Sequence, residues 1–161
     1  MEVVFYNGEF TAKRDVSISS NSRAFNYGDG FFETVKIINS KLFNISCHMQ
    51  RIELALSILN LNNNYTLAFF QEKISYLLVV NKIVNGSVKI HISRNGVGRY
   101  LSNSNCSDLF ITTSNGLAYK QNNSISSCFY DKEYKTLGSL SNIKSCNSLI
   151  SVLASIYANE N

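Results

Sequence analysis

The chain has 161 residues, 45% of them hydrophobic, and a formal net charge of +4 at pH 7. This length and composition fit a globular protein with a core of its own and exclude a disordered chain. Lysines and arginines are scattered, without a basic run or a basic helix face, so we expect no nucleic-acid interface. No apolar run approaches the length that spans a membrane, and no basic-then-apolar leader is visible. We therefore expect neither a membrane protein nor a secreted one.

Cysteine usage indicates a reducing compartment. The four cysteines stand far apart, without a Cys-x-x-Cys pair: Cys47, Cys106, Cys128 and Cys146. In a chain without a secretory signal, this spacing favours free thiols. We therefore expect a cytoplasmic protein, and we expect no metal site.

The first expected elements are two β-hairpins. In "EVVFYNGEFTA", two apolar runs flank Asn7-Gly8, a pair that suits the positive φ angles of a tight hairpin turn. The stretch "FFETVKIINSKLFN" repeats this form around Asn39-Ser40, with a β-rich run and a short return strand.

Two helices and two further strands follow. Apolar residues at helical spacing predict a helix capped by Ser46 and a second helix that starts after Thr66. The runs "SVKIHISR" and "DLFITTS" predict strands, joined by the loop "NGVGRYLSNSN". Together these elements predict an α+β domain over residues 1–115, in which helices cover one side of an antiparallel sheet.

The pattern of apolar and polar residues changes from about residue 116. We expect a polar connector over residues 116–122 and the beginning of a second domain over residues 123–161, with a strand in "ISSCFYDKE". The last stretch predicts a helix with four apolar residues on one face: Leu149, Val152, Leu153 and Ile156. Since no chain follows to cover this face, we expect the second domain to be incomplete.

Three places in the sequence carry groups suited to chemistry. His48 and Arg51 are neighbours on one helix face, and the arginine is either a fork of donors for phosphate or carboxylate oxygens or a solvated helix residue. Lys144 stands between a Gly- and Ser-rich loop and an apolar helix. Partial desolvation there would make its amine nucleophilic, and an exposed loop lysine is the alternative. In "SRNGVGRY", two glycines and an arginine after a strand suit an anion or form a plain hairpin loop.

Taken in order, three stretches resemble the class IV (fold type IV) pyridoxal-phosphate enzymes: "SRAFNYGDGFFETVKIINSKLFNISCHMQRI", "VKIHISRNGVGRY" and "NIKSCNSLISVLA". This family comprises branched-chain and D-amino acid aminotransferases and the aminodeoxychorismate lyases. The resemblance runs from about Val3 to the end of the chain. It rests on an R-x-x-x-Y-G-D-G-x-F-E block, an H-x-x-R on the next helix and a lysine before an apolar helix. The lyases are most similar, through "ISRNGVGRY" and the spacing from Lys144 to Asn147.

The resemblance implies pyridoxal 5'-phosphate as the cofactor, a small N-terminal domain, the start of a larger cofactor-binding domain, and a homodimer. Lys144 matches the lysine that bonds to the cofactor and moves protons at the substrate α-carbon. Arg51 matches the arginine that grips the cofactor phosphate. Five more residues match positions around the substrate: Tyr27, Phe32 and Glu33 in the cavity wall, and Arg99 and Tyr100 in a loop that holds the substrate carboxylate.

The resemblance also gives a role to the turn in "NYGDGFF". Gly28 and Gly30 provide the backbone freedom for a sharp entry into the following strand. We expect Asp29 to tie the turn together through backbone amides. The strand then directs Phe32 toward the cavity, where aromatic rings would exclude water.

The implied reaction is the formation of 4-aminobenzoate and pyruvate from aminodeoxychorismate, a step of folate biosynthesis. The alternatives are a class IV aminotransferase of branched-chain or D-amino acids, and a catalytically silent family member. Family members continue well beyond this length, and the carboxylate that pairs with the pyridine nitrogen lies in that later part. We therefore expect the 161-residue chain to bind the cofactor weakly and to be inactive alone.

Overall fold

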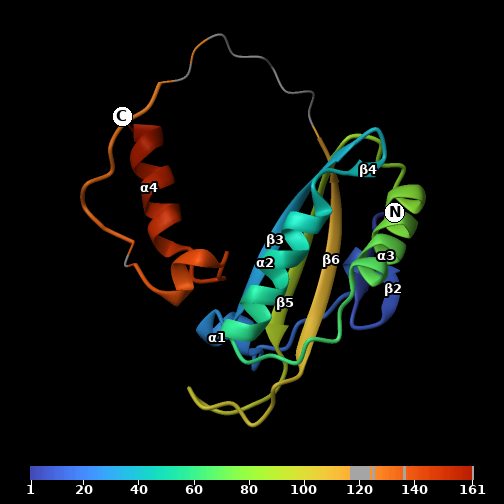
Figure 1. Cartoon of the computed structure of the whole chain (residues 1–161), viewed down its shortest axis with the longest axis horizontal. Coiled ribbons are helices and arrows are strands. Elements are labelled where there is room, and N and C mark those ends of the chain that lie inside the picture. Colours follow the sequence, from blue (N-terminus) through green and yellow to red (C-terminus); the bar gives the residue numbers. More distant parts are fainter. Residues whose placement is uncertain (117–123, 125, 136, 161) are drawn as a thin grey trace.

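The computed structural model describes residues 1–116, 124, 126–135 and 137–160. Its centre is one antiparallel sheet in the order β2-β1-β6-β5-β3-β4 (Figure 1). The strands are β1 (Val3–Tyr6), β2 (Glu9–Ala12), β3 (Gly30–Ile38), β4 (Lys41–Leu42), β5 (Gly86–Arg94) and β6 (Ser107–Asn115). Two helices, α2 (Ile45–Ile58) and α3 (Leu67–Val80), pack on the sheet. The predicted α+β class is therefore confirmed.

Short helical segments and one C-terminal helix complete the described chain. They are η1 (Lys13–Asp15), α1 (Arg23–Tyr27), η2 (Ser139–Asn142) and α4 (Leu149–Glu160). The helix predicted at the end of the chain is confirmed as α4, but its four apolar residues are between 38% and 70% exposed. The expected connector, residues 116–122, lies outside the described residues except for Gly116, and the division into two domains stays a prediction.

The core lies between one face of the sheet and the two long helices. Alternate residues of the central strands point to this face, and α2 and α3 each contribute one buried stripe. The largest fully buried side chains of this core are Phe5, Phe31, Phe70, Ile37, Ile52, Leu56, Ile74, Leu77, Ile90, Ile92 and Ile111. Burial of each such side chain contributes roughly 1.5–3 kcal/mol, so the core fixes the register of β3 and with it the direction of each neighbouring residue.

Local signals in the sequence set the turns and one helix start as predicted. Asn7-Gly8 and Asn39-Ser40 have positive φ angles and connect their strands directly. Thr66 Oγ1 accepts a hydrogen bond from the Phe69 amide at 3.1 Å and caps α3. The predicted cap at Ser46 is wrong, because Asn44 adopts a left-handed conformation and α2 begins at the next residue.

The strand predicted in residues 125–133 is also wrong: the described residues 126–133 form no strand. A strand needs a neighbouring strand to satisfy its backbone groups, and within the described chain no strand pairs with this stretch. A later segment pairs instead with the edge of β3. The Phe32 amide donates to the Lys144 carbonyl at 3.0 Å, and the Cys146 amide donates to the Gly30 carbonyl at 2.9 Å. Ser145 thus faces Phe31 in an antiparallel bridge, which joins the C-terminal segment to the sheet (Figure 1).

Candidate active site

Backbone pairing with β3 positions Lys144. Its carbonyl is held by Phe32, and its Nζ lies 4.9 Å from the centroid of the Phe32 ring. The side chain lines a cavity of about 620 Å³, which Arg51 and Glu33 also line. The structure therefore brings four of the sequence-predicted site residues to one cavity, although they come from β3, α2 and the segment before α4.

Arg51 enters this cavity from α2 and is held there by Glu33. Residues 32 and 33 are neighbours in β3, so the Phe32 ring points to the outer face of the sheet and the Glu33 side chain points toward α2. Glu33 Oε2 accepts a hydrogen bond from Arg51 Nη2 at 2.5 Å and lies 2.7 Å from His48 Nδ1. The Glu33 side chain is 3% exposed, whereas the Arg51 side chain is 54% exposed. Arg51 thus keeps donors that could bind an anion.

The two tyrosines predicted near the substrate line a neighbouring cavity. The rings of Tyr27 and Tyr100 lie 5.7 Å apart between centroids, and both border a cavity of about 420 Å³. Ser145 and Asn147 border both cavities, so the segment around Lys144 separates them. Arg99 is exposed and belongs to the lining of neither cavity.

A buried cluster of charges, not anticipated from the sequence, holds the loop that carries Arg99 and Tyr100. Asp29 Oδ2 accepts a hydrogen bond from Arg23 Nε at 2.8 Å and another from Arg94 Nε at 3.0 Å. Arg23 also donates to the carbonyls of residues 98, 99 and 100, at 3.1, 2.5 and 3.2 Å. Arg94 donates to the carbonyls of residues 59, 60 and 104.

This cluster corrects the expected role of Asp29. Its carboxylate binds two guanidinium groups instead of the backbone amides of its own turn. Arg23 could have been suspected because it opens the R-x-x-x-Y-G-D-G-x-F-E block. Nothing local marks Arg94 as its counterpart, since the two arginines are brought together only by the pairing of β3 with β5.

The two glycines of the turn are required for different reasons. Gly28 ends α1 in a left-handed conformation with φ 63°, and a side chain there would collide with Asn147. At Gly30 an added Cβ would lie 2.7 Å from the Ile92 carbonyl oxygen of β5. The turn therefore allows close approach of both the C-terminal segment and the neighbouring strand.

Sequence reasoning missed Lys89, which lies beside the same aromatic ring as Lys144. Its Nζ is 4.4 Å from the Phe32 ring centroid, and its side chain is exposed. Among the described residues, no ion pair to Lys89 is found. The alternation of "SVKIHISR" carries a signal for it, because strand period two places Lys89 and His91 on one face.

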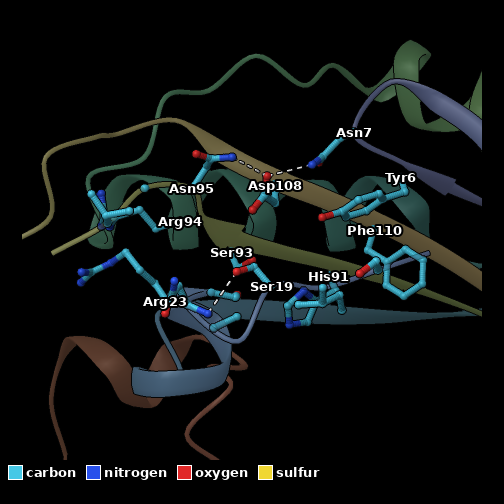
Figure 2. Close-up of a pocket in the computed structure, with 17 residues that line it drawn as sticks. Tyr6, Asn7, Ser19, Arg23, His91, Ser93, Arg94, Asn95, Asp108 and Phe110 are labelled. Atoms are coloured by element: carbon cyan, nitrogen blue, oxygen red, sulfur yellow. Dashed lines mark hydrogen bonds between the residues drawn. The ribbon is translucent and has the colours of Figure 1, made fainter. Parts of the chain in front are cut away.

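The outer face of the sheet continues from Phe32 as a row of paired residues. Phe32 pairs with His91, His91 with Phe110, and Phe110 with Tyr6. Figure 2 shows the last three side by side along a cavity of about 380 Å³. Burial, with Lys89 as a smaller cause, lowers the pKa of His91 below its ordinary 6.5.

Cys146 pairs with the edge of β3 and lies beside His91, at the end of this row. Its Sγ lies 3.2 Å from His91 Nε2. Burial raises the pKa of the Cys146 thiol to about 11, against a smaller lowering effect of Lys89 and a further raising effect of Asp29. The thiol therefore stays protonated near neutral pH, as a packed group beside the candidate lysine. All four cysteines are free.

The part of the chain that the structure describes holds no group of three or more His, Cys, Asp or Glu residues arranged for a metal ion. Within the same residues, no helix combines the length and apolar character needed to cross a membrane.

Comparison with known proteins shows what this arrangement is similar to. The family model "Amino-transferase class IV" matches residues 30–161. The D-alanine aminotransferase of Staphylococcus epidermidis is 33% identical over 99 residues, which cover 62% of this chain and 35% of that protein. The 4-amino-4-deoxychorismate lyase from Pseudomonas aeruginosa matches the fold with a TM-score of 0.76 at 22% identity, over 95% of this chain and 56% of that chain.

A third match is a structure solved with the cofactor bound. The PLP-bound form of a hypothetical aminotransferase from Mycobacterium tuberculosis has a TM-score of 0.57 at 19% identity, over 70% of this chain and 39% of that chain. This chain thus spans 35% of the curated relative and between 39% and 56% of the two solved structures. The structural likenesses show the fold.

Proposed function

This chain belongs to the class IV aminotransferase family, and from that membership we propose that it binds pyridoxal 5'-phosphate and reacts at the amino-bearing carbon of a small amino acid. The observation that supports this function best is the single cavity lined by both Lys144 and Arg51. An amine and a guanidinium at one cavity are the two groups that an aldehyde with a phosphate requires.

The residues present fit this cofactor. The cavity of about 620 Å³ lies within the range of ordinary small-molecule sites. Lys144 is exposed to it, and Arg51 has donors beyond the one bound to Glu33. The Phe32 ring provides an apolar surface beside Lys144, with Nζ 4.9 Å from its centroid. We propose Lys144 as the residue that bonds to the cofactor and Arg51 as the residue that binds its phosphate.

Pyridoxal phosphate, when bound, supplies an electron sink that stabilises negative charge at the substrate α-carbon. The chain's own residues would do the rest. The Lys144 amine would accept and return the proton at that carbon, since its backbone is fixed on the edge of β3. Of the aromatic residues, Phe32 lines the same cavity as Lys144 and would keep water from the reacting atoms, whereas Tyr27 and Tyr100 border the neighbouring cavity.

For the substrate, we propose aminodeoxychorismate, with 4-aminobenzoate and pyruvate as products in folate biosynthesis. Its two carboxylates require two cationic groups near the reacting lysine. Lys89 is one such group, because it lies over the Phe32 ring without an ion pair among the described residues. The second would be Arg99, in the segment that resembles the lyases, although its side chain is exposed and lines neither cavity in this structure.

Amino-group transfer is the second candidate, favoured by a different observation. The curated relative that matches this chain at 33% identity is a D-alanine aminotransferase. A small amino acid with one carboxylate would need only one of the two cationic groups. We also propose a homodimer, because the exposed Tyr100 loop and α4 leave apolar surface that a second copy could cover. From the four free cysteines we propose a cytoplasmic location.

Two measurements test this function. Titration with pyridoxal phosphate should produce the shifted absorption band of lysine-bound cofactor in the wild-type chain and not in Lys144→Ala. Lys135 lines the same cavity, so Lys135→Ala is the matched control and should keep the band. A band that survives in Lys144→Ala would reject the proposed site. If the chain turns over, release of 4-aminobenzoate and pyruvate would then separate the lyase from an enzyme that transfers the amino group to a keto acid, and turnover of either kind would overturn the inactivity expected for the 161-residue chain.

A further inference from the structure

The strongest unexplained feature of the cavity is the buried carboxylate behind Arg51. Glu33 is a charged residue on the core side of the sheet, where an unpaired carboxylate would be costly. Both of its partners come from one face of α2, one helical turn apart: Arg51 at 2.5 Å and His48 at 2.7 Å. The two partners also approach each other, with Arg51 Nη2 3.4 Å from His48 Nδ1. The three side chains form one compact group.

This group has one buried end and one exposed end. The Glu33 and His48 side chains are 3% and 17% exposed, whereas the Arg51 side chain is 54% exposed. An exposed arginine ordinarily samples many rotamers and loses that freedom when it binds an anion. Here the ion pair with Glu33 already restricts the guanidinium, and Nη2 is the atom that it uses. Within the part of the chain that the structure describes, Arg51 forms its hydrogen bonds through Nη2, so the other donors of the guanidinium fork are left for a ligand.

We propose that Glu33 is a positioning residue, which holds Arg51 in the orientation that binds the cofactor phosphate. This inference rests on the proposed function. It gives Glu33 a different role from the one implied by the family resemblance, which placed the residue in the substrate wall. Glu33 acts through Arg51 and needs no contact with the substrate or with the reacting atoms. Phe32, the neighbouring residue in β3, contacts the side of the cavity that holds Lys144.

The test compares two ligands that differ only in the group Arg51 would bind. Pyridoxal phosphate and pyridoxal both carry the aldehyde, but only the first carries a phosphate. Their dissociation constants are measured from the absorption band of the lysine-bound form, and the ratio reports the phosphate contribution alone. This readout needs no turnover. Glu33→Gln keeps the shape of the side chain and removes its charge.

We expect Glu33→Gln to reduce the preference for pyridoxal phosphate about tenfold, as expected for the loss of a charged hydrogen bond, and to leave pyridoxal binding unchanged. Arg51→Gln should reduce the same preference. Because the two residues act as a unit, the double variant should lose no more than Arg51→Gln alone. Glu53→Gln is the matched control, since Glu53 is exposed on the same helix and should keep the preference.

Each other result has a defined consequence. If Arg51→Gln loses the preference and Glu33→Gln keeps it or increases it, the positioning role is wrong and the phosphate site stands. If the wild-type chain does not prefer pyridoxal phosphate over pyridoxal, the proposed function fails and this inference fails with it. Should Glu33→Gln not fold, as judged by circular dichroism, Glu33→Asp replaces it. The shorter side chain keeps the charge but draws it away from Arg51, so the preference should again fall, and an unchanged preference would overturn the role.

Discussion

The amide of Phe32 donates a hydrogen bond to the carbonyl oxygen of Lys144 at 3.0 Å, although more than a hundred residues separate the two in sequence. Together with the bond from the Cys146 amide to the Gly30 carbonyl, it fixes the candidate cofactor lysine on the edge of β3. The Lys144 side chain itself is exposed. The position of the amine therefore depends on backbone pairing, which proline can remove selectively.

Cys146→Pro should detach the Lys144 segment from the sheet, because proline has no amide hydrogen to donate to Gly30. We expect the affinity for the cofactor, measured from the band of the lysine-bound form, to fall about tenfold. This is the size of effect expected for one lost hydrogen bond. Proteolysis of the segment before α4 should also become faster. Cys128→Pro is the control, since Cys128 is exposed in irregular chain. Equal effects of the two prolines would contradict the role of the edge pairing.

Much of the fold was predictable because its signals are local. Asn7-Gly8 and Asn39-Ser40 have the residue types that left-handed turns require, and the stripe from Met49 to Leu56 follows from helical periodicity alone. The bridge between Phe31 and Ser145 was not predictable. Backbone hydrogen bonds between strands do not depend on the types of the side chains. The sequence of β3 therefore does not indicate which later segment pairs with its edge.

The candidate site shows the same division. The family resemblance implied Phe32, Glu33, Arg51 and Lys144, and the fold brings all four to one cavity. The partners of Asp29 depended instead on long-range pairing, because Arg94 reaches it only across the β3–β5 ladder. The resemblance therefore named residues that the fold brings together, whereas the charges that hold the loop of Arg99 and Tyr100 were missed.

Gly28→Ala tests the close approach of the C-terminal segment to the turn. The substitution places a Cβ at a φ of 63° and against Asn147. The left-handed conformation alone costs roughly 1–2 kcal/mol, and displacement of the exposed Asn147 side chain should add a smaller loss in urea denaturation. Gly8→Ala is the matched control, because Gly8 also has a positive φ but no atom within 4 Å of the added Cβ. The double variant Gly28→Ala with Asn147→Gly should regain only the part of the free energy of unfolding that is lost to the collision. An equal loss for Gly28→Ala with and without Asn147→Gly would show that Asn147 does not press on the turn.

Asp29→Asn tests the charge shared by two arginines. The amide oxygen can accept from Arg23 and Arg94 but carries no negative charge, and we expect a loss of about 1.5–3 kcal/mol in the free energy of unfolding, the range for hydrogen bonds to charged groups. Proteolytic cleavage in the loop of residues 96–106 should become faster, because Arg23 would release the carbonyls that it holds. Asp15→Asn, at an exposed pair, should change stability by less than about 1 kcal/mol. An intact loop in Asp29→Asn would contradict the anchoring role.

Cys146 should be the slowest cysteine to react with iodoacetamide. A thiol with a pKa of about 11 is a thiolate in a far smaller fraction at pH 8 than one with the ordinary 9.0, which predicts about a hundredfold slower alkylation. Cys47, Cys106 and Cys128 are exposed and serve as internal standards in the same peptide map. Urea should abolish the difference, because unfolding removes the burial that raises the pKa. Rapid labelling of Cys146 in the folded protein would place its segment away from His91.

His91 should make the protein less stable as the pH falls below about 6.5. Because burial lowers the pKa of His91, the unfolded chain binds this proton more tightly than the folded protein does. The unfolded chain therefore takes up the proton first, and the free energy of unfolding decreases between 6.5 and the lower folded-state pKa, by at most about 1.4 kcal/mol per pH unit for one proton. Urea denaturation between pH 5 and pH 7, about the titration range of histidine, should show this slope in the wild type and a flatter one in His91→Gln. An identical slope in both proteins would assign the pH dependence to other groups and place His91 in a better solvated position than its contact with Cys146 implies.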